Sequence, residues 1–270
     1  VQRRVELRNP RDIDRARLGS KQARLRHSPV PGHVNVQAPL ERVEIDHTLM
    51  NVIVRSDDPS SDFRARPTIT IAVDVFTRCV LGFHIGFEPP SAMAVALCLA
   101  HSVFPKDPKA TYGTNIDWPM HGLMKSIVVD NGKDFRSEAF RRGCMQYGIL
   151  LGYRPVGSPH YGGVIERLIG TFMRRTEVLP GTTKSNVVEK GEYDAVGKAT
   201  LTLSQLRKWM VAQVAAYHAS EHRMLRQPPA SMWVQPVPVP VPDARTFLLD
   251  FLPGDMRTLS RTGVDMHCLQ

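Results

Sequence analysis

The order of apolar and polar positions divides the chain into strand-like segments followed by alternating helices and strands. Three segments near the start are rich in β-branched and apolar residues and predict strands, the last two forming a hairpin: 43–54, 68–76 and 79–87. Two shorter apolar runs predict buried strands, 126–129 and 149–153. Apolar residues recur at helical spacing in four further segments: 91–104, 137–148, 164–175 and 202–217. This order predicts an α/β fold in which helices cover a mixed sheet.

Changes in composition predict four regions along the chain. Residues 1–39 form a basic arm and linker, and residues 40–234 form one core with a polar insertion at about 176–200. Pro alternates with Val in the linker 235–246, which favours a stiff, extended chain. The segment 247–270 predicts the first strands of a second, β-rich module. Because the chain begins without Met and stops abruptly, we expect it to be a piece of a longer protein.

Basic side chains are concentrated at the start of the chain. The protein carries 35 Lys and Arg against 26 Asp and Glu, a net charge of +9, and residues 1–27 alone hold nine basic and three acidic side chains. This excess favours a polyanionic partner, so we interpret the segment either as an arm that follows DNA phosphates or as a solvated, partly disordered tail. The candidate DNA contacts in this arm are Arg15, Arg17, Lys21 and Arg24.

Cysteine spacing and hydropathy exclude several classes of protein. The four cysteines lie far apart and form no CxxC pair, so neither a zinc site nor a disulfide framework is predicted. Cys98 and Cys144 fall in apolar helical patterns and are expected in the core. No stretch approaches a membrane span, and no signal peptide opens the chain. We therefore expect a cytoplasmic protein without a membrane partner.

Three carboxylates stand where a charge is costly unless something neutralises it. Asp46 lies in the middle of the first predicted strand, Asp130 follows the strand 126–129, and Glu166 lies in the first turns of a helix. Taken singly, a strand Asp is more often structural and a helical Glu is more often solvated. Together they predict a cage of hard oxygen ligands for divalent cations, and two such ions about 4 Å apart suit phosphodiester cleavage and joining.

The residues around these carboxylates resemble the catalytic core of DDE transposases and retroviral integrases. The segments that carry the resemblance are Asp-His-Thr at 46–48, Asp-Asn-Gly-Lys-Asp-Phe at 130–135, Ser-Pro-His-Tyr-Gly-Gly-Val-Ile-Glu-Arg at 158–167, and the second strand at 73–82. As in that family, 35 residues separate Asp130 from Glu166. The similarity covers about residues 40–235 and is strongest to the TnsB-like and Mu-type bacterial transposases. In those proteins a small β-barrel follows the core, and the segment 247–270 resembles its start.

This resemblance implies an RNase H-like fold and a DDE-type enzyme with two Mg²⁺ ions, or Mn²⁺ in their place, on Asp46, Asp130 and Glu166. The implied activity is cleavage at transposon 3′ ends followed by strand transfer of the 3′-OH into target DNA. The implied partners are transposon-end and target DNA, further copies of the chain on that DNA, and an AAA+ ATPase that selects the target, all in the bacterial cytoplasm. An RNase H-like nuclease without strand transfer and a catalytically silent DNA-binding scaffold remain open as alternatives.

Basic residues beside the three carboxylates are further candidates for DNA contact, either in the flanking loops or on the helix of Glu166: Lys133, His160, Arg167, Arg174 and Arg175. Each also has a simpler interpretation as a solvated side chain. Asp74, on the second strand, is expected to be structural, because the family uses no metal ligand at that position.

Overall fold

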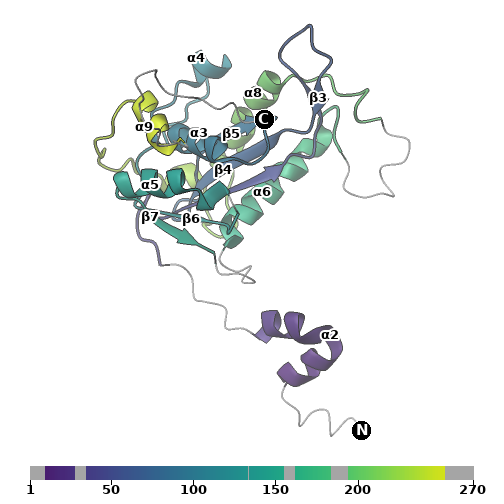
Figure 1. Cartoon of the computed structure of the whole chain (residues 1–270), viewed down its shortest axis with the longest axis vertical. Coiled ribbons are helices and arrows are strands. Elements are labelled where there is room, and N and C mark those ends of the chain that lie inside the picture. Colours follow the sequence, from purple (N-terminus) through teal and green to yellow (C-terminus); the bar gives the residue numbers. More distant parts are fainter. Residues whose placement is uncertain (1–9, 28–34, 133, 155–161, 184–193, 253–270) are drawn as a thin grey trace, which may run out of the picture.

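The computed structural model describes residues 10–27, 35–132, 134–154, 162–183 and 194–252, and a five-stranded sheet lies at its centre (Figure 1). From one edge to the other the strands are β5 (Val80–Gly86), β4 (Thr68–Asp74), β1 (Val43–Leu49), β6 (Ser126–Val129) and β7 (Leu150–Tyr153). The β1–β4 and β4–β5 pairs are antiparallel, whereas the β1–β6 and β6–β7 pairs are parallel. This order and these directions are those of an RNase H-like fold, so the predicted fold class is confirmed.

The first predicted strand, 43–54, is two strands in the structure. β1 ends at Leu49, and β2 (Val54–Arg55) pairs with β3 (Arg64–Ala65) in a separate two-stranded sheet. Arg66 holds the chain between them, because its Nε donates a hydrogen bond to Met50 O at 2.7 Å. The apolar run therefore continues beyond the point at which the strand leaves the main sheet.

The middle of the sheet is buried on both faces. All seven residues of β4 are buried, which fits its nearly continuous apolar and β-branched sequence. β1 is buried from Val43 to Ile45 and only half-buried from Asp46 to Thr48. The core therefore ends along β1 at Asp46.

Helices α3 (Ala92–Val103) and α6 (Gly163–Arg175) cover opposite faces of the sheet. Gly82 of β5 faces α3, where a Cβ atom would lie 2.5 Å from Ser102 Oγ, so only glycine admits the helix this closely. Glu44 of β1 points to the other face and accepts a hydrogen bond from Ile165 N of α6 at 3.2 Å. This contact places the start of α6 beside the half-buried part of β1.

The remaining helical segments pack around this sandwich: α4 (Pro108–Tyr112), η1 (Asp134–Arg136), α5 (Glu138–Gln146), η3 (Thr176–Val178), α8 (Leu203–Ala219) and η4 (Pro229–Met232). The predicted helix starts are confirmed, because Ser91 and Ser137 cap α3 and α5, and Thr202 forms a capping box with Gln205 at α8. Cys98 and Cys144 are buried, as expected.

The prediction of strands from residue 247 onward is wrong for residues 247–251, which belong to helix α9 (Ala244–Phe251). Phe247 and Phe251 are fully buried and pack against Tyr147, which directly follows α5. This partner explains the difference, because two Phe four residues apart lie on one face of a helix. The helix also takes the last residues of the predicted linker 235–246, and residues 253–270 lie outside the described residues.

The predicted tail at the start of the chain is helical where it is described. Helix α2 (Pro10–His27) is interrupted at Gly19, whose φ of 83° and ψ of 161° are not helical. Arg15 and Arg17 are exposed on it, while the side chains of Lys21 and Arg24 are outside the described part. Within the described ranges, no helix is long and apolar enough to cross a membrane.

His218, on α8, is a buried neutral base. Its Nε2 accepts a hydrogen bond from Val80 N at 2.9 Å, and burial lowers the pKa of the imidazole to about 4. Below about pH 6.5 the unfolded chain binds a proton that the folded chain does not, so stability falls as the pH falls. Between pH 6 and 4.5 we expect this residue to remove about 1.4 kcal/mol of unfolding free energy per pH unit. Urea unfolding at several pH values gives the free energy of unfolding as a function of pH. In His218→Gln this pH dependence should be shallower by that amount, and an unchanged pH dependence would contradict the assignment.

Candidate active site

The parallel pairing of β1 with β6 places Asp46 and Asp130 at the same level of the sheet. Glu44 is the register partner of Val128, and each Asp lies two residues further along its own strand direction. Side chains two residues apart point to the same face, so Asp46 shares the face of Glu44, which is the face that α6 covers. Asp46 therefore lies on the face that α6 covers, and Asp130 follows β6 at the same end of the sheet.

Glu166 follows the residue that attaches α6 to the sheet. Ile165 is fully buried and its N–H donates to Glu44 Oε2, while the side chain of Glu166 is 51% exposed. Glu44 is only 2% exposed; burial raises the pKa of its carboxyl, and the Ile165 N–H, Arg154 and Arg42 oppose this rise. Glu44 is thus a structural carboxylate that positions the helix of Glu166.

Arg154 joins two of the three candidate carboxylates. Its Nη1 lies 3.2 Å from Asp46 Oδ2 and 3.8 Å from Glu166 Oε1. Its backbone is fixed at the end of β7, where its N donates to Val129 O at 3.0 Å and its O accepts from Asn131 Nδ2. Asp46 and Glu166, 120 positions apart in sequence, therefore share one guanidinium.

Asp130 lies directly after β6, and its carboxylate makes a local contact. Its carboxylate is exposed, and its Oδ1 accepts a hydrogen bond from Asn131 N in the turn after β6. Over the described ranges, no three His, Cys, Asp or Glu side chains lie close enough together to hold a metal ion. Asp46 and Glu166 thus meet at one guanidinium, and among the described residues Asp130 forms no cluster with them.

The donor chemistry of the site fits a hard divalent cation. All three candidate ligands are carboxylates, which Mg²⁺ and Mn²⁺ prefer, and two of them already converge on one positive group. The sequence pattern did not single out Glu44 or Arg154. Arg154 could have been found from the strand order, because parallel neighbours such as β6 and β7 end at the same edge.

A model of the TnsB C-terminal domain family matches residues 44–181, which is half of the chain and includes Asp46, Asp130 and Glu166. The chain belongs to the TnsB C-terminal domain family. The predicted resemblance to TnsB-like transposases is therefore confirmed, and the matched range contains the strands and the helix that position the three carboxylates.

Relatives of this TnsB-type domain are named as transposases. The chain is 27% identical over 196 residues to the transposase for transposon Tn552 of Staphylococcus aureus, covering 72% of this chain and 37% of that protein. It is 25% identical over 179 residues to the Tn7 transposition protein TnsB of Escherichia coli, covering 61% of this chain and 24% of that protein. The chain therefore spans between a quarter and two fifths of the length of these relatives.

Similar solved structures include two viral integrases. A simian T-cell lymphotropic virus intasome in complex with the PP2A regulatory subunit B56 gamma matches with a TM-score of 0.46 and 15% identity, over 78% of this chain and 61% of that chain. The catalytic core domain of BIV integrase matches with a TM-score of 0.39 and 15% identity, over 71% of this chain and 91% of that chain.

A basic groove of about 940 Å³ begins at Glu166 and follows α6 of the TnsB-type domain. Its other walls are the β4–β5 turn and the chain just after α8, and its basic side chains are Arg78, Arg167, Arg174, Arg175, His222 and Arg223. Arg78 has a left-handed backbone, with φ of 65°, and its buried Nε and Nη1 have no hydrogen-bond partner within the part of the chain that the structure describes. Burial lowers the pKa of Arg78 and the nearby Arg167 lowers it further, whereas Glu44, Tyr217 and Asp74 oppose this fall. The five arginines of the lining outnumber its two carboxylates, Glu166 and Glu221, and this excess suits an anionic ligand.

The three arginines of α6 that were predicted to contact DNA have different surroundings in the structure. Arg167 and Arg174 are exposed in the groove, whereas Arg175 packs 5.7 Å over the Phe172 ring and donates from Nη1 to Gln213 O at 2.9 Å. Arg175 therefore attaches α6 to α8. Lys133 and His160 lie outside the described residues.

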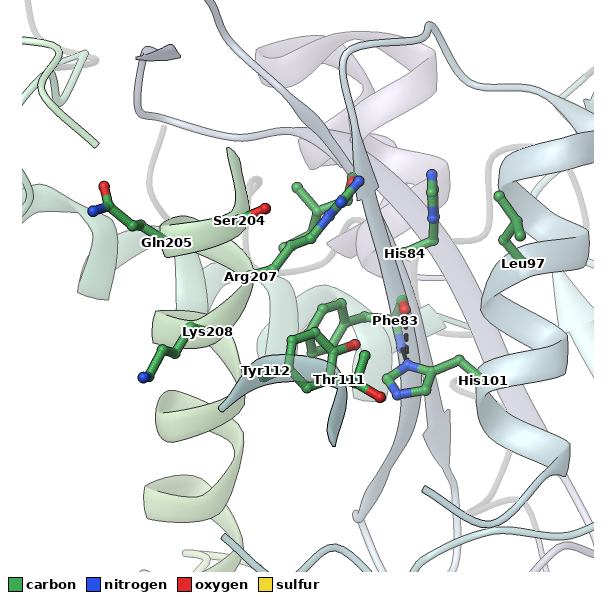
Figure 2. Close-up of a pocket in the computed structure, with 11 residues that line it drawn as sticks. Phe83, His84, Leu97, His101, Thr111, Tyr112, Ser204, Gln205, Arg207 and Lys208 are labelled. Carbon is green, nitrogen blue, oxygen red and sulfur yellow. Dashed lines mark hydrogen bonds between the residues drawn. The ribbon is translucent and has the colours of Figure 1, made fainter. Parts of the chain in front are cut away.

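A separate cavity of about 510 Å³ lies at the β5 edge of the sheet, between α3, α4 and α8 (Figure 2). Its polar side chains bind the backbone of this edge strand: His101 Nδ1 is hydrogen-bonded to the backbone of Phe83, and Arg207 Nη2 donates to Ile85 O at 2.6 Å. They satisfy groups that an edge strand would otherwise expose to another chain. None of the three candidate carboxylates is among the residues that line this cavity.

Proposed function

We propose that this chain is the catalytic core of a DNA transposase, which cuts DNA at transposon 3′ ends and joins the freed 3′-OH to target DNA. The observation that carries the proposal is that Asp46 and Glu166 both lie beside Arg154, while Asp130 directly follows β6, the parallel neighbour of β1. Family membership supports it, because the matched range includes all three carboxylates.

Two reactions would use this one site. Water first attacks the phosphodiester at the transposon end, which breaks its P–O3′ bond and leaves a 3′-OH on the transposon and a 5′-phosphate on the flanking DNA. The freed 3′-OH then attacks a phosphodiester of the target and displaces the 3′ oxygen of the target strand. Asp46, Asp130 and Glu166 would hold two Mg²⁺ ions, or Mn²⁺ in their place, which when bound would supply activation of the attacking oxygen and stabilisation of the leaving oxygen. The chain itself orients these ligands through the sheet and through the Glu44–Ile165 hydrogen bond, and its basic groove would hold the phosphates next to the one that reacts.

The partners of this core are transposon-end and target DNA, bridged by several copies of the chain, with an AAA+ ATPase as target selector. The relatives support the DNA partners through their names as transposases. The two alternatives, a nuclease without strand transfer and a silent DNA-binding scaffold, differ from the proposal in the products that they form.

A branched DNA that mimics the joined product tests the proposal on this chain alone. The reverse of joining uses the same site and needs no recognition of a transposon end. With Mg²⁺ or Mn²⁺, we expect the chain to reseal the target strand and to release the transposon strand with a 3′-OH, as resolved on a denaturing gel. Hydrolysed fragments without a resealed strand would support the nuclease, and binding without any product would support the scaffold.

The basic groove predicts a salt-dependent contribution to DNA binding. Each phosphate contact contributes about 0.7 to 0.9 to the slope of log affinity against log salt concentration. Arg167→Gln and Arg174→Gln should each reduce this slope by about that amount. The measurement is fluorescence anisotropy with a labelled duplex between about 50 and 200 mM salt. Arg141→Gln, an equal change of charge at an exposed position on α5, serves as the control. Equal slopes in all of these proteins would contradict a phosphate-binding role for the groove.

A further inference from the structure

We propose that Arg154 is a built-in counter-ion of the carboxylate site, which holds Asp46 and Glu166 in the absence of divalent cations and must leave for a cation to bind. The inference rests on the proposed function, because it takes the carboxylates as ligands of a divalent cation. It concerns how the site is regulated, and it assigns a role to a residue that lies outside the predicted constellation.

The first observation is the position of the positive charge. The nitrogen that touches Asp46 at 3.2 Å is the same Nη1 that lies 3.8 Å from Glu166. A cation held by both carboxylates would have to lie between them, where this nitrogen lies. The side chain of Arg154 is 10% exposed and that of Asp46 is 18% exposed, so water screens their attraction only in part. The guanidinium and a divalent cation therefore compete for the same oxygens.

The second observation is that Arg154 is held by charge and has few hydrogen bonds. Among the described residues, its Nε and Nη2 are buried without a hydrogen-bond partner, so Nη1 alone of the guanidinium makes polar contacts there. A guanidinium with a permanent structural role normally satisfies its planar set of donors. Because these two nitrogens have no hydrogen bonds to lose, moving the guanidinium away from the carboxylates costs less free energy. The same two nitrogens can bind phosphate oxygens as a pair once DNA is present.

The third observation is the space that Gly162 leaves. A Cβ atom at this position, directly before α6, would lie 2.5 Å from Arg154 Nη1. The φ of Gly162 is −118°, which any residue adopts, so backbone conformation does not require glycine here. The absence of a side chain instead admits the guanidinium to the carboxylates.

Direct measurement of Mn²⁺ binding tests the inference without any need for DNA or turnover. Electron paramagnetic resonance of free Mn²⁺ gives the dissociation constant for the full chain. Arg154→Gln should bind Mn²⁺ about tenfold more tightly than the unchanged protein. Arg154→Lys, which keeps the charge, should stay near the unchanged protein, and so should Arg141→Gln, which removes a remote charge. Gly162→Ala, which displaces the guanidinium and keeps its charge in the chain, should also tighten binding.

Thermal unfolding gives a second readout that a purely structural role would not produce. In EDTA, Arg154→Gln should unfold at a lower temperature than the unchanged protein, because Asp46 and Glu166 lose their shared counter-ion. Added Mn²⁺ should restore the unfolding temperature. If Mn²⁺ does not restore it, and the variant binds Mn²⁺ no more tightly than the unchanged protein, the inference is wrong.

Asp46→Asn separates a failure of this inference from a failure of the proposed function. Combined with Arg154→Gln, it should weaken Mn²⁺ binding strongly relative to Arg154→Gln alone, because Asp46 is the ligand that Arg154 and the cation compete for. If Asp46→Asn weakens binding but Arg154→Gln does not tighten it, the cation site stands and the counter-ion role fails. If Asp46→Asn has no effect in either background, or no protein binds Mn²⁺, the ligand assignment fails and the counter-ion role fails with it.

Discussion

Asp46→Asn is expected to lower the resealing of branched DNA by at least about a thousandfold, because a neutral amide cannot replace a carboxylate that holds a divalent cation at the reacting phosphate. Asp130→Asn and Glu166→Gln should have losses of the same order, since the proposal requires all three ligands. The measurement is the initial rate of strand resealing in Mg²⁺ and in Mn²⁺, with the same chain concentration throughout.

The fold should survive these substitutions. Asp46 lies where β1 leaves the core and is only half-buried, and Glu166 is exposed, so neither change opens the apolar interior. Asp62→Asn, an exposed position in the loop before β3, is the matched control and should keep full activity. If Asp46→Asn retained resealing within tenfold of the unchanged protein, the catalytic assignment would fail.

Asp74→Ala is expected to remove about 3 kcal/mol or more of the free energy of unfolding. The side chain of Asp74 is fully buried at the end of β4. Its Oδ1 accepts from Leu40 N at 2.8 Å, and its Oδ2 accepts from Thr77 N and Thr77 Oγ1, both at 2.7 Å. Alanine would leave these buried donors without partners, and each such group costs about 1–3 kcal/mol. Urea unfolding followed by circular dichroism gives the free energy.

The same turn connects Asp74 to the basic groove. Arg78 N donates to Asp74 O at 2.9 Å, so the carboxylate and the strand end together hold the left-handed backbone at Arg78. We therefore expect Asp74→Ala to weaken DNA binding as well as folding. Asp62→Ala, at an exposed position, should change stability by less than about 0.5 kcal/mol. A loss below about 1 kcal/mol in Asp74→Ala would contradict a structural role for this buried carboxylate.

Local sequence signals were sufficient to predict an element wherever the residues that form it lie close together in the chain. The hairpin of β4 and β5 and the starts of α3, α5 and α8 were predicted, because β-branched runs and capping hydroxyls act within a few residues. Helix α9 was missed because a short apolar run has no period that distinguishes strand from helix. Its conformation depends on Tyr147, which lies about 100 positions earlier and provides the surface on which Phe247 and Phe251 pack.

The sequence by itself was sufficient to predict the family and most strands and helices of the core, and to single out three candidate carboxylates, because these are carried by residue types at short spacing. Only the tertiary structure placed Arg154 between Asp46 and Glu166, since that contact depends on the β6–β7 pairing and on where α6 meets β1. It also placed Arg78 in the groove beside Glu166. A charged residue leaves no periodic signal in the sequence that identifies its partner. Which charged side chains meet is therefore decided by the packing of elements that are far apart in the chain.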